Sequence, residues 1–173
     1  NSSGFAVATH ACTKIGAVMI PSIIFDVAED LEYKLNFSEA KMVITDGPYY
    51  PMFESILSKC PSVKDIVIYR SDGEIPGTHA WNDILASASP ELDHFEIDPL
   101  DTAQMLFTSG TTARPKGVSL THANFLYIGE TCAKSFAVTP DDRYLLILPL
   151  FHVNAQCISY WPCLTAGASI VIC

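Results

Sequence analysis

Residues 108–117 bring together hydroxyl groups, glycines and a lysine in the order Thr-Ser-Gly-Thr-Thr-Ala-Arg-Pro-Lys-Gly. Hydroxyls and backbone N–H groups donate hydrogen bonds to phosphate oxygens, and lysine neutralises their charge. Glycine allows the backbone to approach a ligand closely. A surface turn rich in Ser, Thr and Gly is the alternative, but such turns rarely carry Pro-Lys-Gly as well. The composition therefore predicts a loop that holds polyphosphate.

This loop is not a Walker A motif, which requires Gly, four residues and then Gly-Lys-Ser/Thr before a helix. Here Pro115 stands five residues after Gly110, and Lys116 precedes its glycine. An apolar run at 105–107 comes before the loop, and apolar and polar residues alternate over 118–121. We therefore expect the loop to join two strands.

The same residues resemble the signature loop of the adenylate-forming superfamily, which includes acyl-CoA synthetases, aryl-CoA ligases, luciferases and the adenylation domains of peptide synthetases. The usual loop reads Thr-Ser-Gly-Thr-Thr-Gly-x-Pro-Lys-Gly, and this chain departs from it at Ala113. The resemblance implies that Lys116 is the catalytic cation beside the phosphates of ATP, whereas Arg114 is a weaker candidate because its position varies in the family. The residues implied to bind the nucleotide are Thr108, Ser109, Gly110, Thr111, Thr112, Lys116 and Gly117.

A second motif, Pro-Leu-Phe-His-Val-Asn at 149–154, resembles another core motif of this superfamily. In that motif a histidine on the loop after a strand lies between the nucleotide and the acyl pocket, which implies a catalytic role for His152. A histidine bonded to backbone groups is the alternative, but the phosphate loop in the same chain favours a site residue. The implied acyl wall consists of Phe151, His152, Val153, Asn154 and Cys157.

Resemblance to acyl-CoA synthetases extends to residues 12–21 and 31–41, although Ser22-Ile23 stands where many relatives have Ile-Asn. The phosphate loop together with the Pro-x-Phe-His-x-x-x-Gln-Cys run most resembles crotonobetaine/carnitine-CoA ligases. The implied activity is that of an ATP-dependent acid–thiol ligase, with ATP, Mg²⁺ and CoA taking part. A carboxylate would attack ATP to give an acyl-adenylate, and a thiol would then displace AMP. Two alternatives stay open: an adenylation domain that loads a carrier protein, and a non-catalytic nucleotide-binding module.

Polar residues in the second motif bear on which acid is activated. Asn154 and Gln156 are unfavourable neighbours for a long alkyl chain, because a buried amide without a partner costs about 1–3 kcal/mol. If they line the acyl pocket, they favour a short acid with a polar or cationic tail, such as a carnitine-like acid. The alternative is that both side chains point into the domain and bond to the backbone.

Composition narrows the class of partner. The 173 residues are 49% hydrophobic and 17% charged, as in a globular core, and the net charge of −9 with no basic cluster argues against nucleic acid or an anionic membrane. No signal peptide is recognisable, and the six cysteines form no Cys-x-x-Cys pair, so we expect buried, reduced thiols in a cytoplasmic protein. Residues 144–173 contain no Asp, Glu, Lys or Arg. Prolines and polar residues interrupt this stretch, which favours a buried strand, a helix and a second buried strand over a membrane span.

Alternating helix and strand patterns predict an α/β fold with a largely parallel sheet. Helices are expected over residues 2–15, 28–37, 50–58, 81–87 and 122–136, and strands over 18–20, 42–45, 63–69 and 144–148. We interpret 1–173 as a partial N-terminal AMP-binding domain of a longer protein and expect these residues alone to be inactive. Its predicted parts are first α/β units at 1–70, an irregular connection at 71–100 and a nucleotide-loop half at 101–173. The oligomeric state is not predicted.

Overall fold

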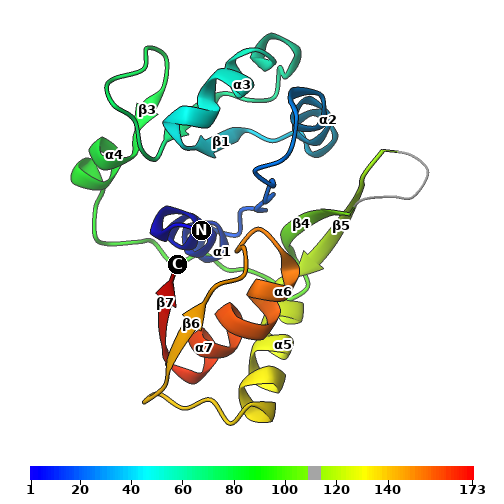
Figure 1. Cartoon of the computed structure of the whole chain (residues 1–173), viewed down its shortest axis with the longest axis vertical. Coiled ribbons are helices and arrows are strands. Elements are labelled where there is room, and N and C mark those ends of the chain that lie inside the picture. The colour runs from blue at the N-terminus through cyan, green and yellow to red at the C-terminus, as the bar shows by residue number, and fades with distance from the viewer. Residues whose placement is uncertain (109–113) are drawn as a thin grey trace. The chain divides into compact units, whose positions relative to one another are not determined.

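The computed structural model describes residues 1–108 and 114–173 and divides the chain into two compact units (Figure 1). The first unit combines residues 1–23 with 94–173, and the second contains residues 24–93. The division after residues 70 and 100 that composition suggests stays a prediction. The first helix belongs with segments far away in the sequence, because Phe5 and Ala6 pack against the cluster of Leu146, Leu150 and Tyr160.

The unit of residues 24–93 is built on a parallel sheet in the order β1-β2-β3. One hydrophobic cluster joins α2 to β1 through Leu31, Leu35 and Val43, and a second contains Ile66 and Ile68 of β2. The elements are α2 (Ala28–Ser38), β1 (Met42–Thr45), η1 (Gly47–Tyr49), α3 (Tyr50–Glu54), η2 (Leu57–Lys59), β2 (Asp65–Ile68), β3 (His79–Ala80) and α4 (Trp81–Ser87).

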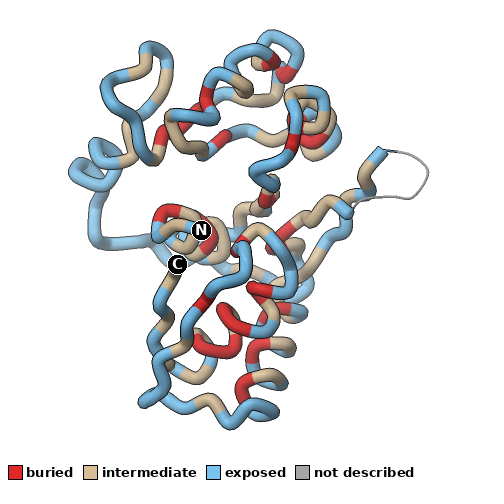
Figure 2. The backbone as a smooth tube through the Cα atoms, in the orientation of Figure 1, coloured by how far each residue is buried: buried red, intermediate tan, exposed pale blue. Residues whose placement is uncertain are grey.

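The other unit contains an antiparallel hairpin, β4–β5, and a parallel pair, β6–β7. Its main hydrophobic cluster consists of Leu146, Leu150 and Tyr160, with Phe5 and Ala6 of the first helix packed against them. Figure 2 shows the buried segments of this unit gathered on the helices beside β6. The elements are α1 (Ser3–Ile15), β4 (Thr102–Thr108), β5 (Lys116–Thr121), α5 (His122–Ser135), β6 (Arg143–Leu146), α6 (Val153–Ala155), η3 (Gln156–Tyr160), α7 (Trp161–Ala166) and β7 (Ser169–Ile172).

Helix ends follow the expected sequence signals. The Ser2 hydroxyl accepts a hydrogen bond from the Phe5 N–H at 3.1 Å, and α1 ends at Gly16 with φ of 72°. Thr121 caps α5 by accepting from the Asn124 N–H at 3.2 Å, while the Thr121 N–H donates to Asn124 Oδ1 at 3.0 Å. The predicted helices at 28–37, 81–87 and 122–136 are confirmed.

Several predicted elements are shorter than expected. The strand at 18–20 is a single bridge, because only Met19 pairs with β4, donating to the Ala103 carbonyl and accepting from the Met105 N–H. Pro21 then has no N–H with which to continue the ladder. The helix predicted at 50–58 ends at Glu54, after which the Ser55 hydroxyl bonds the Met52 carbonyl oxygen at 2.7 Å.

The order of strand, helix and strand over residues 144–173 is confirmed, but the prediction that both strands are buried is wrong. In β6 the side chain of Leu146 is fully buried, whereas its neighbour Leu145 is 57% exposed. β7 alternates in the same way, with Val171 exposed. One face of this strand pair packs on the helices of its own unit, so its apolar composition does not correspond to burial on both faces.

Candidate functional site

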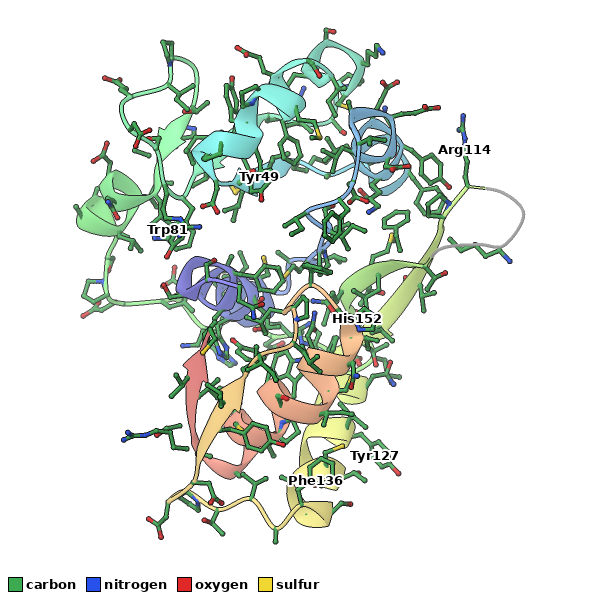
Figure 3. All side chains as sticks on the ribbon, viewed as in Figure 1. Tyr49, Trp81, Arg114, Tyr127, Phe136 and His152 are labelled. Carbon is green, nitrogen blue, oxygen red and sulfur yellow. The ribbon has the colours of Figure 1, made fainter. Side chains whose placement is uncertain are left out.

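The predicted phosphate loop connects the two strands of the β4–β5 hairpin. Thr108, the last residue of β4, is paired with Lys116, the first residue of β5, and Phe107 is paired with Gly117. Both Thr108 and Lys116 are exposed. Figure 3 shows Arg114 at the outer end of the hairpin, away from His152. The predicted ligands Ser109, Gly110, Thr111 and Thr112 lie outside the described residues.

The predicted acyl-wall residues lie on one continuous segment that begins after β6. His152 is the N-cap of α6: its Nδ1 accepts a hydrogen bond from the Asn154 N–H at 3.2 Å, and its own N–H donates to the Pro149 carbonyl at 2.9 Å. The side chains of His152, Val153 and Asn154 are exposed, and Phe151 is half-buried. Because Nδ1 accepts in this arrangement, the neutral imidazole carries its proton on Nε2.

Gln156 points into the unit and not into solvent. It is 1% exposed, and its Nε2 donates to the Leu150 carbonyl at 2.9 Å. For Gln156 the inward alternative is therefore confirmed, and this side chain is not available to an acyl group. Asn154 is exposed, so its side chain is accessible to a ligand.

A π-helical turn, η3, follows His152 and joins α6 to α7. The Trp161 N–H bonds the Gln156 carbonyl, five residues back, and Pro162 comes next. Proline has no N–H and its ring collides with the carbonyl four residues earlier in a regular helix. The wider turn allows the helix to continue through Pro162, and such turns are frequent at functional sites.

Helix α7 packs closely against α5, side by side in Figure 1. The contact forms at Gly129, where an added Cβ would collide with the Thr165 hydroxyl and would lie 3.2 Å from the Trp161 carbonyl oxygen. Nearby, the Phe125 and Trp161 rings contact each other in a tilted arrangement, with centroids 5.1 Å apart and an angle of 35° between their planes. This packing supports the end of the segment that carries His152.

Cys157, the last predicted wall residue, is half-buried on η3, and burial raises the pKa of its thiol. All six cysteines are free, but the prediction of buried thiols holds only for Cys60 and Cys163. Cys173 is exposed and the remaining three are half-buried. The raised pKa of Cys157 disfavours a role as a nucleophilic thiolate.

Other histidines do not join the candidate site. The His10 ring lies against Tyr160, with centroids 5.7 Å apart, and burial followed by the charge of Lys14 lowers its pKa. In the part of the chain that the structure describes, no three His, Cys, Asp or Glu side chains are grouped so that they could hold a metal ion. Every helix in that same part is too short or too polar to cross a lipid bilayer.

Solved structures of adenylate-forming ligases share this fold. The anthranilate-CoA ligase AuaEII in complex with anthranoyl-AMP matches 99% of this chain and 33% of its own, with a TM-score of 0.90 and 22% identity. ATP-bound MatB from Rhodopseudomonas palustris matches all of this chain and 33% of its own, with a TM-score of 0.86 and 26% identity. The fold is thus that of the N-terminal part of these ligases.

The model of the AMP-binding enzyme family matches residues 1–173, so the chain belongs to this family. Among curated proteins, the crotonobetaine/carnitine-CoA ligase of an Escherichia coli strain is 34% identical over 99% of this chain, and that of Shigella flexneri is 33% identical over the same share. The chain spans about a third of the length of these relatives.

Proposed function

We propose that this chain is the nucleotide-loop part of an ATP-dependent acyl-CoA ligase. The observation that carries the proposal is the hairpin, whose strands end in Thr108 and Lys116 on either side of a hydroxyl-rich connection. Thr108 and Lys116 are both exposed, so the two ends of this connection are accessible to a triphosphate. Membership of the AMP-binding enzyme family and the likeness to crotonobetaine/carnitine-CoA ligases support it.

In the proposed first step, a carboxylate oxygen of the acid attacks the α-phosphorus of ATP, and the bond to the bridging oxygen of pyrophosphate breaks. Hydroxyl and amide donors of residues 108–112 and the Lys116 ammonium stabilise the charge on the departing pyrophosphate. No protein nucleophile is needed for this step. In the second step the thiol sulfur of CoA attacks the acyl carbon, and AMP leaves.

His152 and its neighbours are proposed to contact the acyl group. The exposed His152, Val153 and Asn154 are accessible to a ligand, and Phe151 and Cys157 are half-buried beside them. With its proton on Nε2, the imidazole would be a hydrogen-bond donor toward a developing oxyanion. We propose that Mg²⁺ binds together with ATP, because this ion is usually held by one or two carboxylates and by substrate phosphates.

The class of acid is proposed from Asn154 and from the relatives. An exposed amide at the acyl wall disfavours a long alkyl chain, of which each buried methylene is worth about 0.8 kcal/mol against apolar walls. The wall therefore favours a small acid with a polar or cationic tail, and the crotonobetaine/carnitine-CoA ligases support a trimethylammonium acid as the first candidate. The inward position of Gln156 leaves Asn154 as the main polar contribution.

An assay of the intact protein that contains these residues tests the proposal. We expect carboxylate-dependent exchange of pyrophosphate into ATP and formation of an acyl-CoA, both in the cytoplasmic fraction of the source cell. Transfer to a carrier protein but not to CoA would favour the peptide-synthetase alternative, and ATP binding without exchange would favour a non-catalytic module.

Competition between carnitine and palmitate, measured as kcat/KM, decides the class of acid. A preference for palmitate would contradict the proposed small polar or cationic acid. The isolated 173 residues are expected to show no exchange above a control without enzyme.

A further inference from the structure

The loop between β6 and η3 is held at Leu150 from two sides. The Leu150 N–H donates to Asn1 Oδ1 at 2.7 Å, and the Leu150 carbonyl accepts from Gln156 Nε2 at 2.9 Å. Leu150 itself is 2% exposed and belongs to the main hydrophobic cluster of this unit. Both backbone groups of this residue are thus bound by side chains, one from the beginning of the chain and one from the π-helical turn.

Asn1 also connects the loop to the ends of both parallel strands. Its Nδ2 donates to the Leu148 carbonyl at 3.1 Å and to the Cys173 carbonyl at 2.9 Å. Leu148 follows β6, and Cys173 follows β7. A single amide side chain therefore fixes the loop relative to the β6–β7 strand pair.

Gln156 makes a bond that would be costly to lose. It is 1% exposed, its side-chain Nε2 donates to the Leu150 carbonyl, and its Oε1 is buried without a partner among the described residues. Breaking the bond would leave the Leu150 carbonyl buried and unpaired as well. The polar amide at this buried position therefore serves the loop through its hydrogen bond to Leu150.

We propose that Asn1 and Gln156 are positioning residues, which hold the loop of residues 149–152 so that the His152 imidazole keeps one place and one tautomer. This rests on the proposed function, in which His152 contacts the acyl group. His152 lies two residues after Leu150 and four before Gln156, and the bonds from its N–H to Pro149 and from Asn154 to its Nδ1 complete a closed turn. If the hydrogen bonds that join Leu150 to Asn1 and Gln156 are lost, no side chain of the described residues holds this turn at Leu150.

Gln156→Met tests the proposal, because methionine fills a similar volume without donating a hydrogen bond. The chain offers a matched control in Gln104→Met. Gln104 on β4 is 2% exposed and, among the described residues, also has an unpaired Oε1, while its Nε2 donates to the Met19 sulfur at 3.8 Å. Both variants replace a buried amide by a thioether, and only Gln156→Met removes a bond to the His152 loop.

Two measurements on the intact protein separate positioning from stability. Spectra of ¹⁵N-labelled histidine report the tautomer of His152, whose resonance is assigned from its loss in His152→Gln. We expect Gln156→Met to move this resonance toward the value for a mixture of tautomers. We also expect the variant to lower kcat for adenylation about 10- to 100-fold, with the rate expressed per titrated active site. KM for ATP should change less than about threefold, and Gln104→Met should leave the His152 resonance and kcat unchanged. An unchanged His152 resonance in Gln156→Met, or equal effects of the two variants, overturns the proposal.

Variants of Asn1 extend the test to the other side of Leu150. Asn1→Asp keeps an acceptor for the Leu150 N–H but cannot donate to the Leu148 and Cys173 carbonyls, whereas Asn1→Ala removes all three bonds. We expect the Leu150 amide to exchange about tenfold faster with solvent in Asn1→Ala and close to the wild-type rate in Asn1→Asp. Wild-type exchange in Asn1→Ala contradicts the role of Asn1. If the wild-type protein forms no acyl-adenylate, the proposed function fails, and the histidine spectra alone then decide the positioning.

Discussion

The β4–β5 hairpin and the loop between β6 and η3 belong to the same unit. The structure supports the candidate functional residues of the two regions in different ways. The hairpin presents exposed Thr108 and Lys116 on an antiparallel pair of strands. The other loop is anchored at the buried Leu150 by two side-chain amides and packs on a hydrophobic cluster. A contiguous motif therefore identifies the hairpin, whereas the support of His152 depends on residues 1 and 156, which are far apart in the sequence.

This difference predicts that substitutions at the loop end of the hairpin change the reaction rate with little effect on stability, and that substitutions in the helices packed behind the other loop lower stability first. The largest effect is expected for Lys116→Ala. Loss of one preorganised electrostatic group costs on the order of 10²-fold or more in rate, while an exposed strand residue contributes little to the core. Adenylation by the intact protein should fall accordingly with an unchanged melting temperature. Lys134→Ala is the control, since Lys134 is an exposed cation whose bond is a 3.3 Å surface pair with Glu130. A fall in stability without a fall in rate would contradict the assignment of Lys116.

The opposite behaviour is expected for Gly129→Val, behind the second loop. The added side chain would collide with Thr165 and the Trp161 backbone, so α5 and α7 must separate. We expect the free energy of unfolding to fall by about 2–3 kcal/mol, as for other overpacked cores. Gly73→Val is the control, because nothing lies within 4 Å of a Cβ added at Gly73. Thr165→Ala in the same chain should restore part of the loss, and chemical denaturation measures all three variants.

Elements with strong local signals could be predicted from the sequence. Ser2, Gly16 and Thr121 place helix ends that the structure contains, because capping depends on residues within one turn. Two strands flanking the phosphate loop were predicted from the apolar and alternating residues on either side of it, and both form, although their antiparallel pairing was not predicted. The strand β3 was missed because it consists only of His79 and Ala80 and depends on pairing with β2.

Long-range features of the candidate site could not be predicted. No local pattern indicates that Asn1 bonds the Leu150 N–H, since 149 residues separate them. Gln156 was noticed as a polar residue beside the motif, but its direction is decided by the Leu150 carbonyl and by the π-helical turn. The motif identified His152 and its neighbours as candidate site residues. The hydrogen bonds that hold their loop could be found only in the structure.

Thr121 lies at the junction of the two regions, as the last residue of β5 and the N-cap of α5. Thr121→Ala removes the acceptor of the Asn124 N–H and should lower the free energy of unfolding by about 1 kcal/mol. Thr121→Ser retains the hydroxyl and should stay near the wild type. Because the cap starts a helix at the end of β5 opposite to Lys116, kcat for adenylation should change less than about twofold. A loss of rate as large as that of Lys116→Ala would show that the start of α5 affects adenylation, and would contradict this prediction.

The smallest effect is expected at Asp142, in the turn that leads into β6. Its Oδ2 accepts from the Thr139 N–H at 2.7 Å and from the Thr139 hydroxyl at 3.0 Å, and these bonds lower the pKa of the carboxyl group. A lowered pKa in the folded state means that ionised Asp142 adds stability above its unfolded pKa of about 3.9, and that this stability is lost as the pH falls through the folded value.

Asp142→Asn should therefore lower the melting temperature slightly at pH 7, and the difference from the wild type should shrink as the pH falls below about 4. The exposed Asp141 beside it, as Asp141→Asn, is the control for the loss of one negative charge. Thermal unfolding across this pH range measures both variants. If the Asp142→Asn difference were constant with pH, or matched that of Asp141→Asn, the ionised bonds to Thr139 would not be what holds this turn. The position of residues 149–152 would then depend on the packing of Leu146 in the hydrophobic cluster and on the two hydrogen bonds to the Leu150 backbone.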